Sequence, residues 1–207
     1  MKIFGTILLL ITIQAISVGQ TGWQVQYESI GDEYYDLYFI NGFTGWAINT
    51  WPPYDLLKTT NKGVNWNVIM TSGYRDGTGI TFYNEMTGWL CTSSGGVYKS
   101  INGGINWTRS DCGSCGTADD FIDIQFINQN TGWLYGDYHI FKTTNGGLNY
   151  FPLNCSLIVY NGMFLDSVNG WVAGYGGVAR STNGGLNWGE YAITNEYRIQ
   201  NIYFANL

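Results

Sequence analysis

The residues of this sequence whose types could carry out catalysis form no recognised catalytic pattern. The single histidine, His139, lies between Tyr138 and Ile140, which predicts a residue at the end of a β-strand rather than a general base. Asp119 and Asp120 are adjacent carboxylates in a glycine-rich segment, where such pairs more often bind nothing, or hold a cation loosely, than act on a substrate. No Gly-x-Ser-x-Gly, phosphate-binding loop or His-Glu-x-x-His pattern occurs. We therefore expect no metal, no cofactor and no enzyme.

The arginines bear on the one enzymatic alternative, a sialidase-like hydrolase acting on glycans. Such an enzyme needs an arginine cluster that holds the substrate carboxylate, a Tyr–Glu nucleophile pair and an acid carboxylate. The arginines of the sequence are Arg75, Arg109, Arg180 and Arg198. Because Arg109 and Arg180 flank repeated turn motifs described below, we expect them on outer positions, away from a shared site.

The four cysteines divide into a close pair and two isolated residues. Cys112 and Cys115 stand in a Gly/Ser/Asp-rich loop without a flanking strand–helix pattern, which disfavours a thioredoxin-like redox role. Neither a second Cys-x-x-Cys nor a nearby histidine is present to complete a zinc site. We expect a disulfide that closes this loop, and buried thiols at Cys91 and Cys155.

A second group of residues has the chemistry of a binding surface. Aromatic residues beside carboxylates and an arginine can bind a protein or a glycan, although they can also be ordinary polar turns. They occur in short segments between apolar runs, and they are Trp51, Tyr54, Tyr74, Arg75, Asp76, Asp119, Asp120 and Tyr175. Whether they share a face depends on the elements that carry them.

Three short signatures recur in a fixed order along the chain. The first, apolar-x-Phe-x-Asn, starts at residues 37, 80, 124 and 202, with a degenerate copy from Met163 to Asp166. The second is Thr/Asn-Gly-Trp, and its tryptophans are Trp46, Trp89, Trp133 and Trp171. The third, Ser/Thr-x-Asn-x-Gly-x-Asn-Trp/Tyr, occupies residues 59–66, 100–107, 143–150 and 181–188. A period shared by three patterns predicts a repeat protein.

Each repeat reads as four short strands separated by Gly, Asn or Asp. In the third repeat we expect strands at about Ile122–Ile127, Gly132–Tyr135, Ile140–Thr143 and Asn149–Leu153. Four antiparallel strands every 40 or so residues are typical of a blade of an all-β β-propeller. In that fold the candidate binding residues lie in loops of one face.

The third signature resembles the Asp-box, or BNR repeat, of sialidases and many secreted propellers, with asparagine in the place of aspartate. Asparagine still accepts backbone N–H bonds within a turn, so we expect a structural clasp between the third and fourth strands of each blade. Its residues are Asn61, Gly63, Trp66, Asn102, Gly104, Trp107, Asn145, Gly147, Tyr150, Asn183, Gly185 and Trp188. With Thr-Gly-Trp in the preceding hairpin, the chain resembles the photosystem II stability/assembly factor-like propellers over residues 21–207.

The expected domain organisation is a signal peptide at residues 1–20 and a propeller at 21–207, with repeats at about 34–70, 79–110, 121–153 and 158–193. Segment 22–28 resembles an outer strand without inner strands, and 198–206 resembles an inner strand without outer ones. These two could pair to close a ring of about five blades. Since propellers that the chain resembles have about seven, we expect instead a fragment of a ring of roughly seven blades.

Residues 3–16 form an apolar run after Lys2, shorter than the roughly 20 residues of a spanning helix, which favours a cleaved secretory signal over a retained anchor. A net charge of −6 disfavours nucleic acid and anionic lipid as partners. We expect a secreted, periplasmic or cell-surface scaffold that binds an unknown protein or cell-surface glycan, without a membrane span after signal removal. A module of a larger surface adhesin is a further alternative.

Overall fold

A computed structural model describes residues 34–49, 52, 54–71, 76–110, 112, 120–192 and 198–204. The expected signal peptide at 1–20 and outer strand at 22–28 lie outside the described residues, as do the last three residues of the chain. Within the described residues all regular elements are β-strands, and no helix there is long and apolar enough to cross a membrane.

Sixteen strands form four separate antiparallel sheets, each with its four strands in sequence order. The innermost strands are β1 (Tyr34–Phe39), β5 (Gly77–Phe82), β9 (Phe121–Phe126) and β13 (Val159–Phe164). The second strands are β2 (Gly45–Asn49), β6 (Gly88–Thr92), β10 (Gly132–Gly136) and β14 (Gly170–Gly174). The third strands are β3 (Leu56–Thr59), β7 (Val97–Ser100), β11 (Ile140–Thr143) and β15 (Gly177–Ser181). The outer strands are β4 (Asn67–Met70), β8 (Thr108–Arg109), β12 (Phe151–Leu153) and β16 (Gly189–Ala192).

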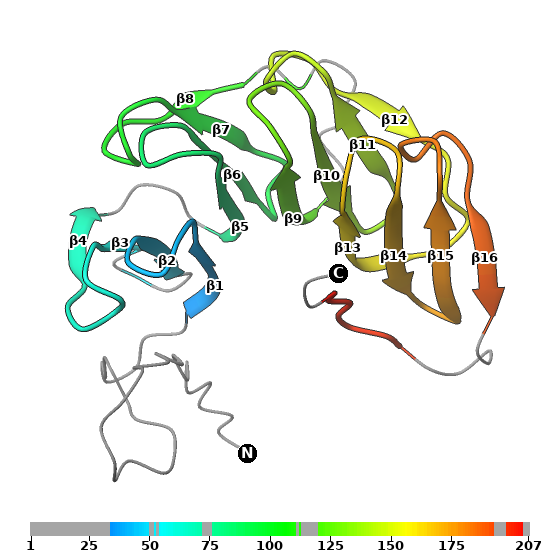
Figure 1. The fold of residues 1–207 in the computed structure, drawn as a ribbon, viewed down its shortest axis with the longest axis horizontal. Helices are drawn as coiled ribbons and strands as arrows, with labels where there is room; N and C mark the ends of the chain where they lie inside the picture. The colour runs from blue at the N-terminus through cyan, green and yellow to red at the C-terminus, as the bar shows by residue number, and fades with distance from the viewer. Residues whose placement is uncertain are drawn as a thin grey trace, which may run out of the picture.

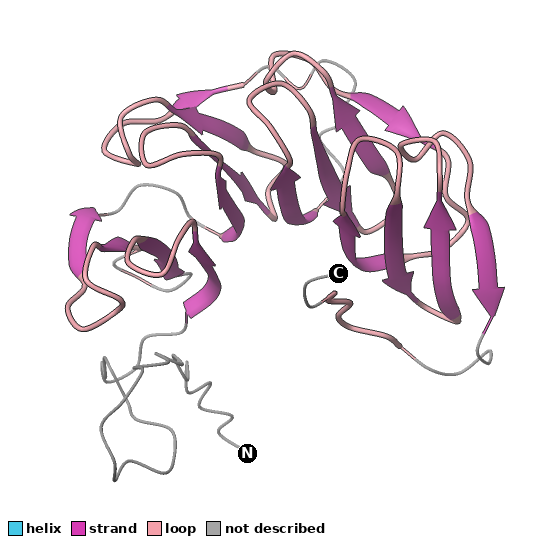
Figure 2. Cartoon of the chain, in the orientation of Figure 1, coloured by secondary structure: helices cyan, strands magenta, loops and turns pink. Residues whose placement is uncertain are grey.

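The four sheets stand side by side along an arc, with β1, β5, β9 and β13 on its concave side (Figures 1 and 2). Each innermost strand contacts the innermost strand of the next sheet. Radial four-stranded sheets arranged in this way are the blades of a β-propeller, so the predicted fold class is confirmed. We number the blades one to four in chain order.

The asparagine of the first signature explains the turn between the first and second strands. Asn41 Oδ1 accepts hydrogen bonds of 2.8 Å from the backbone N–H groups of Phe43 and Thr44. Asn84, Asn128 and Asp166 make the same pair of bonds in the other blades. A side chain that supplies the turn's hydrogen bonds fixes a tight hairpin at the end of an apolar strand.

The tryptophan of the second signature joins each blade to the next. Trp46, Trp89 and Trp133 are fully buried, and their rings stack on Phe82, Phe126 and Phe164 at centroid distances of 3.6, 3.6 and 3.7 Å. Each Nε1–H donates to the carbonyl of a glycine in the next blade, at Gly103, Gly146 and Gly184. We call this set of contacts the blade junction. The glycine before each tryptophan lies opposite the phenylalanine of its own blade, where a Cβ would overlap the ring.

A lysine completes each junction. Lys58, Lys99 and Lys142 of the third strands place Nζ 4.8–5.1 Å above the tryptophan rings. Lys99 and Lys142 also donate to the carbonyls of Gly146 and Gly184. In all three junctions the ammonium group adds a cation–π attraction to the stacked pair, and in the junctions of Trp89 and Trp133 it also binds a backbone acceptor of the next blade.

The fourth repeat departs from the expected alignment. Phe164 pairs with Gly170 as Phe126 pairs with Gly132, so the position of Ile80 and Ile124 is taken by Gly162 rather than Met163. The Tyr135 ring fills this space, since a Cβ on Gly162 would overlap it. The degenerate copy therefore begins one residue earlier than its sequence suggests.

Candidate functional site

The propeller has two faces, and the three signatures gather on one of them. We call the end formed by the hairpins between strands one and two and between strands three and four the turn face. In the hairpin of blade one, Asn61 Oδ1 accepts from the N–H of Asn65, and Thr59 Oγ1 accepts from the N–H of Gly63. Blades two to four repeat these bonds at Asn102, Asn145 and Asn183. The repeated residues are therefore engaged in turns and junctions.

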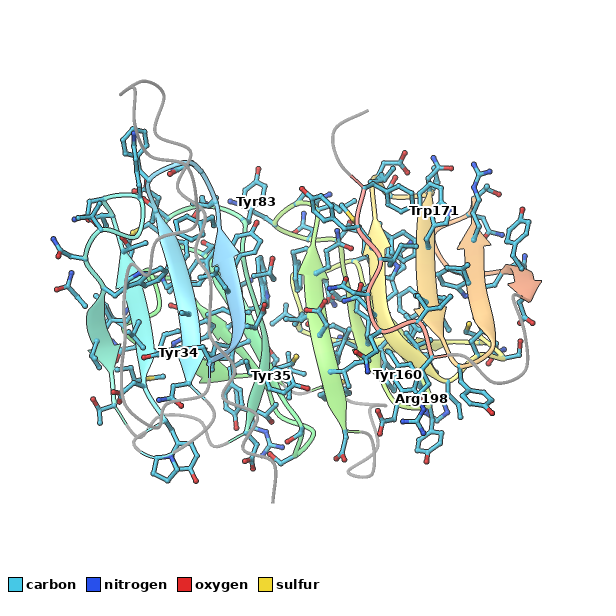
Figure 3. All side chains as sticks on the ribbon, turned by 90° about the horizontal axis from the view of Figure 1, so that it is seen from below. Tyr34, Tyr35, Tyr83, Tyr160, Trp171 and Arg198 are labelled. Carbon is cyan, nitrogen blue, oxygen red and sulfur yellow. The ribbon has the colours of Figure 1, made fainter. Side chains whose placement is uncertain are left out.

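The opposite end, which we call the loop face, carries the loops between strands two and three and between successive blades. These loops differ from blade to blade in length and sequence. Figure 3 separates the two ends: Tyr83 and Trp171 lie toward the turn face, while Tyr35, Tyr160 and Arg198 lie toward the loop face. Because the loops are free of the repeated contacts, the loop face is the candidate functional site.

Four of the residues predicted for the binding face are described, and they lie on loop-face segments. Asp76 and Asp120 are exposed, and their carbonyls accept from the N–H groups of Ser93 and Asp137. Tyr175 is 43% exposed and forms a β-bridge with Arg198, whereas Tyr54 is half-buried. The structure thus ties Asp76, Asp120 and Tyr175 to different blades. Trp51, Tyr74, Arg75 and Asp119 lie outside the described residues.

The cysteines were assigned to a loop disulfide and two thiols. Cys112 is disulfide-bonded, and Cys115 lies outside the described residues. Cys91 and Cys155 are free thiols; Cys91 is fully buried, and Cys155 is half-buried. Burial raises the pKa of the Cys91 thiol well above its ordinary value, which keeps it protonated.

A β-bulge in each innermost strand sets the residues nearest the loop face. The ladder skips Tyr35, Thr78, Ile122 and Tyr160 in the four blades. The next positions are Asp36, Gly79, Asp123 and Asn161. A bulge changes the direction of the side chains at one point of a strand, and the four bulges lie at equivalent positions of the four innermost strands. Nothing in the sequence marks these positions, because they lie within apolar strand patterns.

Asp36 and Asp123 place two carboxyl groups among the innermost strands of blades one to three. Asp36 accepts 2.7 Å hydrogen bonds from the N–H groups of Leu37 and Ile80, and Asp123 accepts one from Ile124. Desolvation raises the pKa of Asp36, and desolvation together with the charge of Asp36 raises the pKa of Asp123 well above the ordinary range. Gly79 of blade two packs against Asp123 so closely that a Cβ on Gly79 would overlap the Asp123 backbone.

Tyr35 lies close to these carboxyl groups from blade one. Its side chain is 59% exposed. Partial desolvation raises its pKa, and the negative charges of Asp137, Asp123 and Asp36 act in the same direction. Since Asp123 and Asp137 belong to blade three, the hydroxyl of Tyr35 on blade one is influenced by charges of another blade. We call Tyr35, Asp36, Asp123 and Asp137 the axial cluster.

A second group lies on blade four. The Arg198 guanidinium is 5.9 Å from the centroid of the Tyr160 ring, and Arg198 forms a β-bridge with the exposed Tyr175. Figure 3 places Tyr160 and Arg198 at the same end of the molecule as Tyr35. An arginine of the chain therefore already occupies a tyrosine face here. We call Tyr160, Tyr175 and Arg198 the blade-four patch.

The groups required by the hydrolase alternative are not brought together in the described part of the chain. Arg109 ends β8, Arg180 lies over Trp171 at 5.2 Å, and Arg198 lies on the loop face. His139 is exposed and directly precedes β11. No group of three His, Cys, Asp or Glu side chains among the described residues is arranged to hold a metal ion.

Sequence comparisons give no family for the chain: no family model matches, and no curated protein matches. Solved structures with a similar fold include YCF48 bound to a D1 peptide, with a TM-score of 0.60 and 17% identity over 78% of this chain. They also include a GH74 enzyme from Niastella koreensis (TM-score 0.61, 18% identity, 76% of this chain) and a catalytically inactive virginiamycin B lyase from Staphylococcus aureus (TM-score 0.62, 14% identity, 81% of this chain). The matches span 55%, 30% and 58% of those three chains. At such identities the likeness concerns the fold, which binding proteins and enzymes share.

Proposed function

We propose that this propeller is a non-enzymatic scaffold that binds a protein partner through its loop face. The observation that carries the proposal is the division between the two faces. The repeated residues are used in turns and blade junctions, which leaves non-repeating tyrosines and carboxylates on the loop face. Rigid sheets that hold variable loops are a common way to build a binding surface.

The chemistry of the loop face favours a partner segment with a lysine or arginine side chain. The axial cluster includes the exposed Tyr35 and the half-buried Asp137, and Asp76 and Asp120 are exposed on neighbouring loops. Carboxylates attract a cation, and a tyrosine face holds it by a cation–π contact. The stacking of Arg198 on Tyr160 is an example of this contact within the chain. The net charge of −6 favours the same kind of partner.

The YCF48 structure that resembles this chain contains a bound peptide, which supports a protein segment as the partner class. The resemblance to a GH74 enzyme keeps hydrolysis as an outcome to be tested. We propose a peptide rather than a glycan because the described arginines lie on separate elements, and a glycan carboxylate would need several of them together.

The finer assignments made from the sequence are part of this proposal. We propose that the four asparagine turns are Asp boxes with asparagine in the aspartate position, and that the chain belongs with the photosystem II stability/assembly factor-like propellers. We also propose that residues 1–20 direct export, so that the scaffold acts outside the cytoplasm. The bonds from Asn61 Oδ1 and Thr59 Oγ1 support the first assignment.

The test is selection of binding peptides on the immobilised protein from a random 12-residue phage library. The expected result is enrichment of sequences with lysine or arginine next to an apolar residue. Tyr175→Ala should weaken the selected peptides at least about 5-fold, the loss expected for an interface tyrosine worth ~1 kcal/mol. Tyr83→Ala is the matched control, because Tyr83 is equally exposed, at 43%, but lies toward the turn face.

Three results would contradict the proposal. They are enrichment of acidic peptides, equal losses in the two tyrosine variants, and the absence of any enriched sequence. Release of dye from fluorogenic glycosides that is abolished by Asp123→Asn would instead establish the hydrolase alternative. Binding to a glycan array without peptide binding would replace the partner class.

A further inference from the structure

Trp171 is the fourth tryptophan of the series, and its junction is incomplete. Unlike Trp46, Trp89 and Trp133, it is only half-buried. Its ring is 4.6 Å from that of Phe204 and tilted by 48°, whereas the complete junctions stack at 3.6–3.7 Å with angles of 5–6°. Within the described residues its Nε1–H has no acceptor, although a glycine carbonyl accepts in each complete junction.

The segment that covers Trp171 is attached to blade four at its start, where Arg198 forms a β-bridge with Tyr175 and the Ile199 N–H donates to the Gly174 carbonyl at 3.2 Å, but it forms no strand within the described residues. Residues 198–204 take the place of the innermost strand of a next blade, since Ile202 N–H donates to Asn161 Oδ1 as Ile80 N–H donates to Asp36 Oδ2. That bond is 3.3 Å long, against 2.7 Å for its counterpart. Tyr203, in the middle of the segment, is 79% exposed. Within residues 198–204 the segment therefore supplies one aromatic ring to Trp171 and no carbonyl that accepts from its N–H.

Blade one presents the complementary half of a junction. Phe39 corresponds to Phe82, Phe126 and Phe164, since each pairs with the glycine of the second signature. It is half-buried, and its ring contact within the described residues is with Trp66 of the same blade, at 5.8 Å and 83°. No tryptophan of another blade stacks on it in the described part of the chain.

The acceptor for the missing tryptophan bond is also present on blade one. Lys62 stands where Gly103, Gly146 and Gly184 stand in the other blades, and it adopts the same left-handed backbone with φ of 66°. Its N–H donates to the carbonyl of Phe43, as the N–H of Gly103 donates to Met86. The carbonyl of Lys62 therefore has the setting of the three carbonyls that accept from tryptophan.

We propose that the chain pairs head to tail with a second copy of itself through these two half-junctions. Trp171 of one copy stacks on Phe39 of the second copy and donates to the Lys62 carbonyl there. Arg180, which already lies 5.2 Å over Trp171, takes the role of Lys58, Lys99 and Lys142. The reciprocal contact joins the four described blades of each copy into one ring, at the upper end of the known range of roughly four to eight blades.

The second copy is the occupant that the contacts favour over the segment at 198–204. The same contact set already joins the chain's own blades three times, and within the described residues its two halves on blades one and four take part in no complete junction. Pairing replaces a tilted contact with a parallel stack and satisfies the Trp171 N–H. Phe204 must leave, so the segment acts as a competitor for the surface.

The test is sedimentation velocity of the purified protein over a range of concentrations. The wild type should sediment as a dimer that dissociates on dilution. Trp171→Ala and Phe39→Ala should each weaken the dimer at least about 30-fold, as expected for central interface residues. Tyr191→Ala is the control for loss of an exposed aromatic, because Tyr191 is 62% exposed on the outer strand β16 and should leave the dimer unchanged.

Mixing the two variants makes the test specific for a head-to-tail arrangement. A mixed dimer of Trp171→Ala and Phe39→Ala retains one intact junction, whereas each variant alone retains none. The mixture should therefore associate more tightly than either variant. Wild type that remains monomeric, a Trp171→Ala protein that still dimerises, or a mixture that behaves like its components would each overturn the proposal.

Phe204→Ala separates the competitor from a permanent cover. If the segment competes with the second copy, removing its ring should strengthen the dimer and leave the melting temperature of the monomer nearly unchanged. If the segment is the true occupant, the variant should lower the melting temperature without any change in association, which would also overturn the proposal. Circular dichroism of every variant confirms that it has folded.

Discussion

Asp36, Asp123 and Asp166 show how one residue type takes different roles in this chain. Asp166 is fully exposed, and hydrogen bonds from the Asn169 side chain and from the backbone of Asn169 and Val168 lower its pKa. Asp36 and Asp123 lie on innermost strands, and loss of water raises their pKa values despite their bonds to backbone N–H groups. At the residue scale, position in the fold decides whether a carboxylate stabilises a turn or carries an unfavourable charge.

Asp123→Asn should therefore change how stability depends on pH. A folded pKa raised above the unfolded value means that the wild type loses stability as pH rises from about 3.8 through the raised value. The variant keeps an acceptor for the Ile124 N–H but has no charge to desolvate. We expect it to be more stable than the wild type at neutral pH and similar to it in acid, measured by urea unfolding across that range.

Asp166→Asn is the control with the opposite sign. The lowered pKa of Asp166 gives stability that is present above its ordinary value and is lost as pH falls through the lowered one. This variant should be slightly less stable than the wild type at neutral pH and equal to it in strong acid. The same direction in both variants would contradict the assignment of the two environments.

At the scale of the strand and the hairpin, the blades share one plan but fill their junctions differently. Ile48 lies with Ile80 in the first junction, and Cys91 lies with Ile124 in the second. The third has Tyr135 against Gly162. Gln125 secures the same junction, because its side chain accepts from the N–H of Phe164 and donates to the carbonyl of that residue. A large ring and a glycine thus replace two residues of moderate size.

Replacing Gly162 and Tyr135 by isoleucine and cysteine, the residue types of the second junction, tests whether the two side chains share one space. Gly162→Ile should cost more than about 3 kcal/mol, because the added side chain overlaps the Tyr135 ring. Tyr135→Cys should cost about 3–5 kcal/mol, because it leaves a cavity. The double variant should recover at least about 1 kcal/mol of the summed loss in urea unfolding. Strictly additive losses would show that the two residues do not share one space.

At the scale of the whole molecule, the main strand-to-strand contacts of the described residues join neighbouring blades along the arc, so the fold depends on its junctions (Figure 1). Unfolding of such arrays is governed by the coupling between adjacent units. The junction of Trp89 and Phe126 is the middle one of the three, and the junction of Trp46 and Phe82 joins the first blade to the rest. Loss of the middle junction and loss of the first junction should therefore change the cooperativity of unfolding in different ways.

Trp89→Ala should cost about 3–5 kcal/mol and separate unfolding into two steps, because it divides the arc into halves of two blades. Trp46→Ala should cost a similar amount but release one blade, so that most of the signal stays in a single transition. Circular dichroism and tryptophan fluorescence, followed together in urea, distinguish the two patterns. A single, unchanged transition in Trp89→Ala would contradict a fold held together at its junctions.

The fold followed from the sequence because its signatures are local. One such signature is an asparagine that accepts from the N–H groups two and three residues later, and another is a glycine opposite a phenylalanine such as Phe39. Each produces a sequence motif that recurs in every blade. The third repeat shows the precision of this prediction: its innermost strand was expected at 122–127 and lies at Phe121–Phe126. The displaced start of the fourth repeat was missed because Gly162 makes sense only beside Tyr135, which belongs to another blade.

The residues of the candidate site could be predicted from the sequence less well than the fold, because their surroundings are set by the tertiary structure. The loop residues could be assigned to one face from strand order, but Tyr35, Asp36 and Asp123 read as ordinary strand residues. A bulge skips Tyr35, and the neighbouring inner strands remove water from the two carboxyl groups. Sequence alone thus determined the repeated blade, because each blade's hairpins are stabilised within a few residues. Only the packing of blade against blade decided which carboxyl groups lose water, and which aromatic rings remain without a complete partner.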